Sequence, residues 1–220
     1  MSRARKAGRV LRNEGHRALW WRGLATVAYR RVAVLVKDAQ LEPARPAPAG
    51  LRIDRIGDGE VDQYRRLRPD TPEDEARRRL GSGEICVLAR LDGEPIACRW
   101  YSLGRAEVPY LGFAFELPEA LAYVHDAYTA PPARGRGLSP PLRRHGEALL
   151  SDLGAPRFLA TVVPENTAGM QLTLAAGFEP VGRLAALRLP GRRILLRKLA
   201  VGHVGPEQRI PVPWSIPAPG

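Results

Sequence analysis

Cysteine is scarce in this 220-residue chain, which contains only Cys86 and Cys98. Neither has the partner spacing of a metal site, so no bound metal is predicted. The two cysteines flank Leu91-Asp-Gly-Glu94, which is typical of a two-residue hairpin turn. In that register Cys86 lies opposite Arg99, and Cys98 points to the other face of the sheet. A disulfide is therefore not expected, and reduced, packed cysteines indicate a reducing compartment.

Long apolar runs and internal repeats are also missing. No stretch approaches the roughly 20 apolar residues that a membrane-spanning helix needs. The arginine-rich start lacks the uninterrupted apolar core of a signal peptide. Because 45% of the residues are apolar, the chain can bury one substantial core. We therefore expect a cytoplasmic protein with one main domain and extensions.

Acidic residues are nearly absent from residues 1–37. Glu14 stands there against ten Lys or Arg residues, so nine of the eleven net positive charges lie in this segment. Trp20 and Trp21 share the segment with arginines in a helix-like pattern, which leaves two interpretations. The arm either packs on the domain or lies on an anionic membrane surface or an acidic partner, as a peripheral protein would. The arm has few aromatic residues and no recognised nucleic-acid fold, so a specific nucleic acid is not an expected partner.

The chain divides into three segments by composition. Residues 1–49 form a basic arm with an amphipathic helix, an extra strand and a Pro-rich linker, and residues 200–220 form a Pro/Gly-rich tail, extended or disordered. Residues 50–199 alternate strand and helix patterns, with hairpins at both ends. This order predicts an α/β domain whose mixed, mostly antiparallel sheet is flanked by helices. The expected strands cover 30–37, 51–56, 85–90, 95–101, 108–115, 122–129, 157–163, 178–189 and 192–199, and the expected helices of the domain cover 60–67, 72–80, 140–153 and 166–176.

A glycine-rich turn joins the strand that ends near Thr129 to the helix that begins near Pro140. Gly135 and Gly137 lack a Cβ, so the turn can adopt positive φ values and direct several backbone N–H groups into one concavity. The helix that follows would point its positive N-terminal end at the same place. A phosphate or pyrophosphate is the expected occupant, with Arg134 and Arg136 at the rim.

The sequences that flank this turn make it specific. Upstream runs Tyr123-Val-His-Asp-Ala-Tyr-Thr-Ala-Pro131, and downstream lie Asn166 and Gly177-Phe178. Together with Arg134-x-x-Gly137-x-Ser139, these resemble the Gcn5-related N-acetyltransferase (GNAT) superfamily, whose motif reads Arg/Gln-x-x-Gly-x-Gly/Ala. The resemblance covers roughly residues 50–199. It implies the GNAT fold, acetyl-CoA as cosubstrate, no metal, and direct acetyl transfer to a small-molecule or peptide amine.

The resemblance also implies which residues bind CoA, with two departures from the family pattern. Ser139 stands where the family has Gly or Ala, and Pro140 behind it has no N–H to offer a phosphate. Thr173 stands where many members carry a tyrosine that protonates the leaving thiolate. Both departures favour an alternative, a CoA- or partner-binding module without turnover. The implied CoA-binding residues are Ala127, Tyr128, Thr129, Arg134, Gly135, Arg136, Gly137, Leu138, Ser139 and Asn166.

The candidates for proton transfer lie on the strand before the turn. His125 and Asp126 stand where relatives such as polyamine acetyltransferases carry an acidic pair. A regular strand alternates, so only one of the two faces the reacting groups, and Asp126 could orient His125 only through a bent or bulged strand. His125 is the candidate base, because an unperturbed histidine is largely neutral at pH 7. The alternative is a structural histidine that only satisfies its own hydrogen bonds. The acid that protonates the leaving thiolate is Tyr128 or water, unless the thiolate leaves unassisted. Longer acyl-CoA and acyl-carrier protein remain as alternative acyl donors.

Overall fold

The computed structural model describes residues 29–39, 47–189, 192–199 and 207–209. The predicted amphipathic helix, most of the Pro-rich linker and most of the tail lie outside these residues. The chain divides into two compact units. We call Lys37–Ala106 with Leu117–Ala160 the glycine-turn unit, and the described parts of Met1–Val36, Glu107–Glu116 and Thr161–Gly220 the terminal unit. None of the described helices is long and apolar enough to cross a membrane.

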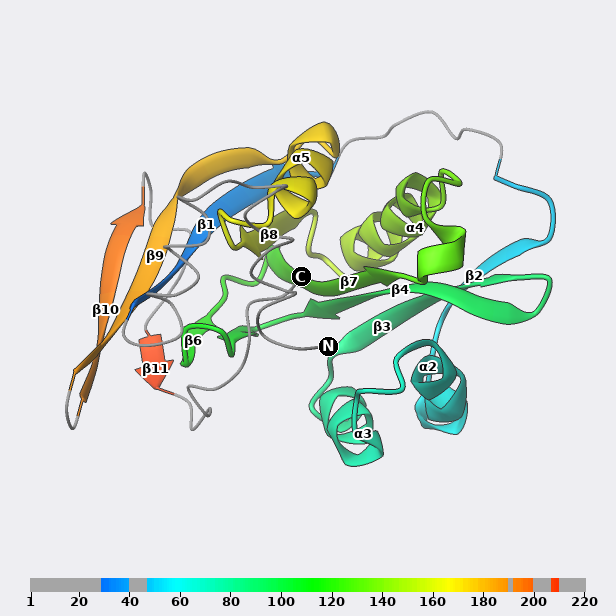
Figure 1. Ribbon diagram of the computed structural model, residues 1–220, viewed down its shortest axis with the longest axis horizontal. Coiled ribbons are helices and arrows are strands. Elements are labelled where there is room, and N and C mark those ends of the chain that lie inside the picture. The colour runs from blue at the N-terminus through cyan, green and yellow to red at the C-terminus, as the bar shows by residue number, and fades with distance from the viewer. Residues whose placement is uncertain (1–28, 40–46, 190–191, 200–206, 210–220) are drawn as a thin grey trace, which may run out of the picture. The chain divides into compact units, whose positions relative to one another are not determined.

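The glycine-turn unit is a mixed sheet with helices on both faces. Its strands pair in the order β8-β7-β4-β3-β2, and β7 runs parallel to β8 while the other pairs are antiparallel. Helix α4 covers one face of the sheet, and α2 and α3 cover the other (Figure 1). This arrangement confirms the predicted fold class. The elements are β2 (Leu51–Arg55), α2 (Val61–Leu67), α3 (Glu73–Gly81), β3 (Ile85–Leu91), β4 (Glu94–Ser102), β7 (Leu121–Thr129), α4 (Ser139–Asp152) and β8 (Arg157–Val162), with short 3-10 helices at Asp58–Glu60 and Pro131–Ala133.

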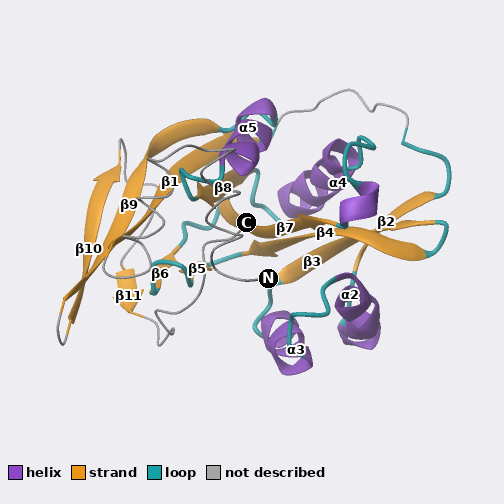
Figure 2. Ribbon diagram, viewed as in Figure 1, coloured by secondary structure: helices purple, strands orange, loops and turns teal. Residues whose placement is uncertain are grey.

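The terminal unit is built mainly from antiparallel strands (Figure 2). Strands β10, β9 and β1 are neighbours in that order, which confirms the predicted strand over 30–37 and the predicted hairpin over 178–199. The single strand expected over 108–115 is instead two short strands, and three residues of the tail form a strand that pairs with one of them. The elements are β1 (Tyr29–Asp38), β5 (Arg105–Val108), β6 (Phe113–Glu116), α5 (Thr167–Ala175), β9 (Glu179–Leu189), β10 (Arg192–Leu199) and β11 (Glu207–Arg209).

An apolar cluster attaches α2 and α3 to the sheet. Tyr64 from α2 and Trp100 from β4 are fully buried and meet edge to face, with ring centroids 5.4 Å apart. Such an aromatic pair adds about 0.5–1.5 kcal/mol to the effect of burial alone. The helices are therefore fixed against the strand surface that carries the candidate site. The buried members of the cluster are Ile56, Val61, Tyr64, Leu67, Ala76, Cys86, Leu88, Cys98 and Trp100.

The two cysteines lie on the same face of the sheet, so the predicted placement of Cys98 on the opposite face is wrong. The hairpin register shifts between Ala89 and Arg90, because β4 carries one extra residue there. Cys86 consequently lies opposite Trp100 rather than Arg99. Both cysteines are buried and free. Burial raises the pKa of both thiols, that of Cys98 to about 12, which keeps them protonated.

Three basic residues of the predicted arm are engaged inside the protein. Arg30 and Lys37 are buried, and Arg31 pairs with Glu165 at 2.6 Å. Lys37 Nζ lies 3.1 Å from a carboxylate oxygen of Glu147. These three charges therefore do not contribute to a surface for anionic membranes or acidic partners. The other seven basic residues of the arm lie outside the described residues, and binding through them stays a prediction.

Candidate functional site

The carboxyl end of β7 has a backbone edge without a ladder partner among the described strands. The parallel pairing of β7 with β8 begins at Leu121 opposite Arg157 and stops at Val124 opposite Ala160. Beyond that point β7 continues for five residues, to Thr129, and pairs only with β4 on its other edge. Ala127 in this stretch is exposed. Backbone groups on the free edge are available to another molecule.

A β-bulge interrupts β7 in the same stretch. His125 lies opposite Trp100 and Tyr128 lies opposite Cys98, so two residues of β7 face the single residue between these partners. Asp126 has a φ of 43°, a left-handed conformation that Asp tolerates better than most residues. Because of the bulge, His125, Asp126 and Tyr128 all turn toward the face that α2 and α3 cover. The three predicted catalytic residues therefore lie together.

Asp126 is held by an arginine on each of its oxygens. Arg68 Nη1 lies 3.1 Å from Oδ1, and Arg79 Nη1 lies 3.1 Å from Oδ2. The Tyr64 hydroxyl also donates to Oδ2, at 3.3 Å. Burial, followed by the nearby Asp126 carboxylate, raises the pKa of Tyr64 to about 12, so this hydroxyl keeps its proton. Both oxygens of the Asp126 carboxylate are therefore engaged, and this carboxylate is the counter-ion of two guanidinium groups.

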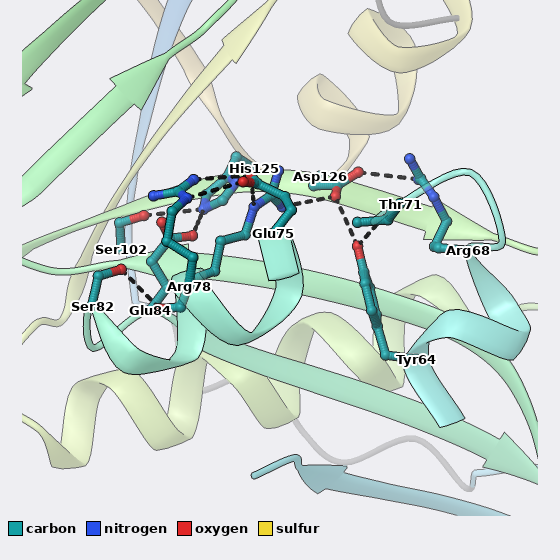
Figure 3. Close-up of polar contacts among 11 residues, drawn as sticks. Tyr64, Arg68, Thr71, Glu75, Arg78, Ser82, Glu84, Ser102, His125 and Asp126 are labelled. Carbon is teal, nitrogen blue, oxygen red and sulfur yellow. Dashed lines mark hydrogen bonds and ion pairs between the residues drawn. The ribbon is translucent and has the colours of Figure 1, made fainter. Parts of the chain in front are cut away.

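His125 contacts a different set of polar groups. Its Nε2 atom lies 3.0 Å from Ser102 Oγ and 3.2 Å from Glu84 Oε2. The ring stacks on Tyr123, with centroids 5.3 Å apart and planes at 11°. Figure 3 shows the His125 contacts beside the Asp126 contacts, both over α3. Within the described part of the chain, no group of three or more His, Cys, Asp and Glu residues could hold a metal ion.

Tyr128 packs beside Asp126 rather than standing free. Its ring is partly buried against the apolar cluster under α2 and α3. The guanidinium of Arg68 lies over the ring, 4.5 Å from the centroid. A cation over an aromatic face is stabilised by the ring quadrupole, and Arg68 also pairs with Asp126. Arg68 thus connects two of the three predicted catalytic residues.

The turn between β7 and α4 has the geometry that its two glycines predicted. Gly135 and Gly137 have φ values of 76° and 69°. Residues 134–137 are exposed, and no described residue accepts a hydrogen bond from the backbone N–H groups of residues 135–139. Arg134 Nε donates to Thr129 O at 3.1 Å, which ties the turn to the end of β7. Helix α4 begins at Ser139 despite Pro140 and Pro141, because proline is tolerated in a first helical turn.

Two predicted residues lie in the terminal unit and have local roles there. The Asn166 side chain accepts a hydrogen bond from the backbone N–H of Gly169 at 2.9 Å, so it caps helix α5. The Thr173 hydroxyl donates to the backbone carbonyl of Gly169 at 2.8 Å. Binding of CoA by Asn166 stays a prediction. The Thr173 hydroxyl is already used within its own helix, in line with its expected failure as an acid.

Sequence reasoning missed five residues that surround His125 and Asp126. They come from α2 and its C-cap, from α3, from the residue before β3 and from the end of β4, far apart in the sequence. Only the strand register brings them together, and both bulges shift that register. In the sequence, the charged residues of α2 and α3 fit a solvated helix face as well as they fit a functional site. The missed residues are Tyr64, Arg68, Arg79, Glu84 and Ser102.

Comparison with family models identifies the chain. The model described as "Acetyltransferase (GNAT) family" matches residues 53–178, more than half of the sequence. The chain belongs to the GNAT acetyltransferase family. This match runs from within β2 to just past α5, and so includes the bulge in β7 and the glycine turn. No curated protein matches the chain.

Two solved structures of GNAT proteins share the fold. A putative GNAT acetyltransferase from Novosphingobium aromaticivorans is 21% identical with a TM-score of 0.53, and the match covers 73% of this chain and 64% of that one. A GCN5-related N-acetyltransferase from Kribbella flavida is 18% identical with a TM-score of 0.53, covering 81% and 65%. The aminoglycoside N-acetyltransferase AAC(6')-Iy in complex with CoA is 20% identical with a TM-score of 0.49, covering 62% and 92%. This GNAT protein therefore spans about two thirds of the first two chains.

Replacing Asp126 tests whether it anchors the bulge. Asn tolerates positive φ much as Asp does, so Asp126→Asn removes the charge without adding backbone strain. We expect the free energy of unfolding to fall by about 1–3 kcal/mol, because two partly buried guanidinium groups lose their counter-ion. Urea unfolding measures the loss. The control is Asp62→Asn, whose side chain is 81% exposed, and a change under about 0.5 kcal/mol is expected there. Equal stabilities of the two variants would contradict the anchoring role.

Proposed function

We propose that the protein transfers an acetyl group from acetyl-CoA to an amine in a ternary complex. The observation that carries this proposal is the glycine turn with unbonded N–H groups at residues 135–139, placed between β7 and α4 in a chain of the GNAT family. An exposed row of backbone donors at a helix start suits a doubly charged pyrophosphate. Arg136 and Arg134 add positive charge beside it. Ser139 and Pro140 leave one donor fewer than the family motif.

The thioester is proposed to lie along the free edge of β7. Pantetheine carries amide groups, which can pair with a strand edge as another strand would. The edge after Val124 has no ladder partner among the described strands, and it leads directly to the glycine turn. A backbone N–H of Ala127, Tyr128 or Thr129 then polarises the thioester carbonyl as negative charge develops on its oxygen.

The amine acceptor is proposed to approach from the side of His125. The amine nitrogen attacks the thioester carbon, the C–S bond breaks, and the CoA thiolate leaves. The proton lost by the amine passes to His125, directly or through one water, because Asp126 is already paired with Arg68 and Arg79. Protonation of the thiolate by Tyr128 or by water stays a prediction.

The pyrophosphate assignment is tested by Gly137→Glu. A Cβ at Gly137 meets no heavy atom within 4 Å, so the substitution places its carboxylate in open space where the phosphates are proposed to bind. We expect calorimetric titration to show affinity for CoA falling at least about 100-fold, which is about 2.7 kcal/mol.

The matched control is Gly154→Glu at the other end of α4. Gly154 also has a positive φ, of 85°, and also has nothing within 4 Å of a built Cβ. The two variants therefore carry similar backbone strain and the same added charge, and the control should keep wild-type affinity. Similar affinities of the two variants for CoA would contradict the assignment.

The base is tested by His125→Ala. We expect turnover on a proven amine to fall about 100-fold or more at neutral pH, with a smaller loss at high pH where the amine is already unprotonated. Affinity for CoA should not change. Full activity of His125→Ala together with an inactive Asp126→Asn that still folds would assign the base to Asp126. Binding of CoA without any transfer to a panel of amines would favour the binding-module alternative.

A further inference from the structure

We propose that Glu84 is a positioning residue for His125: its carboxylate keeps the imidazole proton on Nε2, so that Nδ1 receives the proton from the amine. The inference rests on the proposed function. It deepens that function by assigning separate roles to the two ring nitrogens, and it brings in Glu84 and Ser102, two residues that family motifs in the sequence did not indicate.

The two polar neighbours of His125 meet the same ring nitrogen. Ser102 Oγ and Glu84 Oε2 lie 3.0 Å and 3.2 Å from Nε2. An ionised carboxylate only accepts hydrogen bonds, so it favours the ring form that has a proton on Nε2. In the neutral ring the lone pair then lies on Nδ1, which makes Nδ1 the basic atom.

Among the described residues, His125 is the one basic partner of the Glu84 carboxylate. The Glu84 side chain is only 14% exposed. Its Oε2 atom is buried and accepts no hydrogen bond from the described residues, although His125 Nε2 lies 3.2 Å away. A buried carboxylate oxygen without a donor is costly. His125 Nε2 is the cationic partner within reach, and the pair becomes an ion pair when the ring accepts its second proton. Glu84 therefore stabilises the imidazolium that proton transfer creates.

Two aromatic residues hold the plane of the ring while Glu84 selects its tautomer. Tyr123 stacks at 5.3 Å, and Trp100 lies at 6.5 Å with planes at 29°. Stacking restricts rotation of the ring but does not distinguish one nitrogen from the other. The polar contacts at Nε2 make that distinction, so the ring is ordered before substrate binds.

The other charges near His125 are paired with one another. Asp126 on β7 is paired with Arg68 and Arg79, and Arg79 also lies over the Trp100 ring, 5.2 Å from its centroid. Burial lowers the pKa of Arg79, but the Asp126 and Glu75 carboxylates raise it by more. The net pKa is raised, so this arginine stays charged. On α3, Glu75 pairs with Arg78 and Arg79 (Figure 3). Glu84 is thus the carboxylate of this group that contacts His125 rather than an arginine.

Ser102 is not a nucleophile of a serine, histidine and acid triad. In such a triad the hydroxyl and the carboxylate bind opposite ring nitrogens, so that one nitrogen takes the hydroxyl proton. Here both groups meet Nε2. Ser102 is also only 5% exposed, which keeps a substrate from its oxygen. Ser102, like Glu84, holds the His125 ring in place through its contact with Nε2.

The test is Glu84→Gln, which keeps the side-chain shape and removes the charge. We expect kcat/KM for the amine at pH 7 to fall at least about 10-fold, because the tautomer is no longer fixed and the imidazolium loses its counter-charge. In Glu84→Gln, nitrogen-15 NMR should show that the neutral His125 ring no longer holds its proton only on Nε2. A purely structural defect would lower kcat/KM without changing the ring tautomer.

Two controls show whether Glu84 acts through His125. Glu119→Gln changes an exposed glutamate before β7 and should keep the wild-type kcat/KM. In a His125→Ala background, Glu84→Gln should cause no further loss of turnover, because two residues that act as one unit are not additive. Nitrogen-15 NMR of His125 in the wild-type protein, without substrate, should show the neutral ring with its proton on Nε2.

The outcomes separate this inference from the proposed function. If His125→Ala is impaired while Glu84→Gln behaves as Glu119→Gln does, the role of Glu84 is overturned and the proposed base stands. If His125→Ala keeps wild-type turnover, the proposed base fails and the inference fails with it. A neutral His125 ring with its proton on Nδ1 in the NMR experiment overturns the inference whatever the activities are.

Discussion

The bulge in β7 is the constraint on which the candidate site depends. In a regular strand His125 and Asp126 would point to opposite faces of the sheet. The left-handed conformation of Asp126 turns both toward α2 and α3, and the ion pairs with Arg68 and Arg79 hold that conformation. A single carboxylate thus stabilises the bulge, contacts residues of both helices, and pairs with the two arginines nearest to it within the described part of the chain. The strain of one residue at positive φ is offset by partners that a surface Asp would lack.

In the glycine-turn unit, the proposed CoA site is built from backbone groups and the proposed proton-transfer site from side chains. Backbone N–H groups at residues 135–139 form the part suited to the charged end of a nucleotide, and the free edge of β7 suits its extended arm. Polar and charged side chains are concentrated around His125, where the proposed mechanism moves a proton. Because the proposed pyrophosphate site relies on glycine conformation and a helix start, we expect it to tolerate Ser139 and Pro140 better than a side-chain site would tolerate loss of its charged group.

Much of the fold could be predicted from the sequence, because hydrophobic patterns and turn residues are local signals. The glycine turn, the helix after it and the parallel strand over 157–163 all carry such signals. The facing of Cys98 was predicted wrongly, since one extra residue in β4 changes every later partner in the hairpin. The same limit hid Glu84, Ser102 and the arginine partners of Asp126. A bulge is selected by contacts distant in the sequence, and a lone Asp in a strand is a weak sign of positive φ.

A crystal structure of the full chain with bound acetyl-CoA tests the central claim most directly. The account predicts pyrophosphate oxygens within hydrogen-bond distance of the N–H groups of residues 135–139. It also predicts the thioester carbonyl beside the backbone of Ala127–Thr129, with His125 Nδ1 facing the reacting carbon directly or through one water. Acetyl-CoA bound elsewhere, or a thioester on the far side of β7 from His125, would contradict the account.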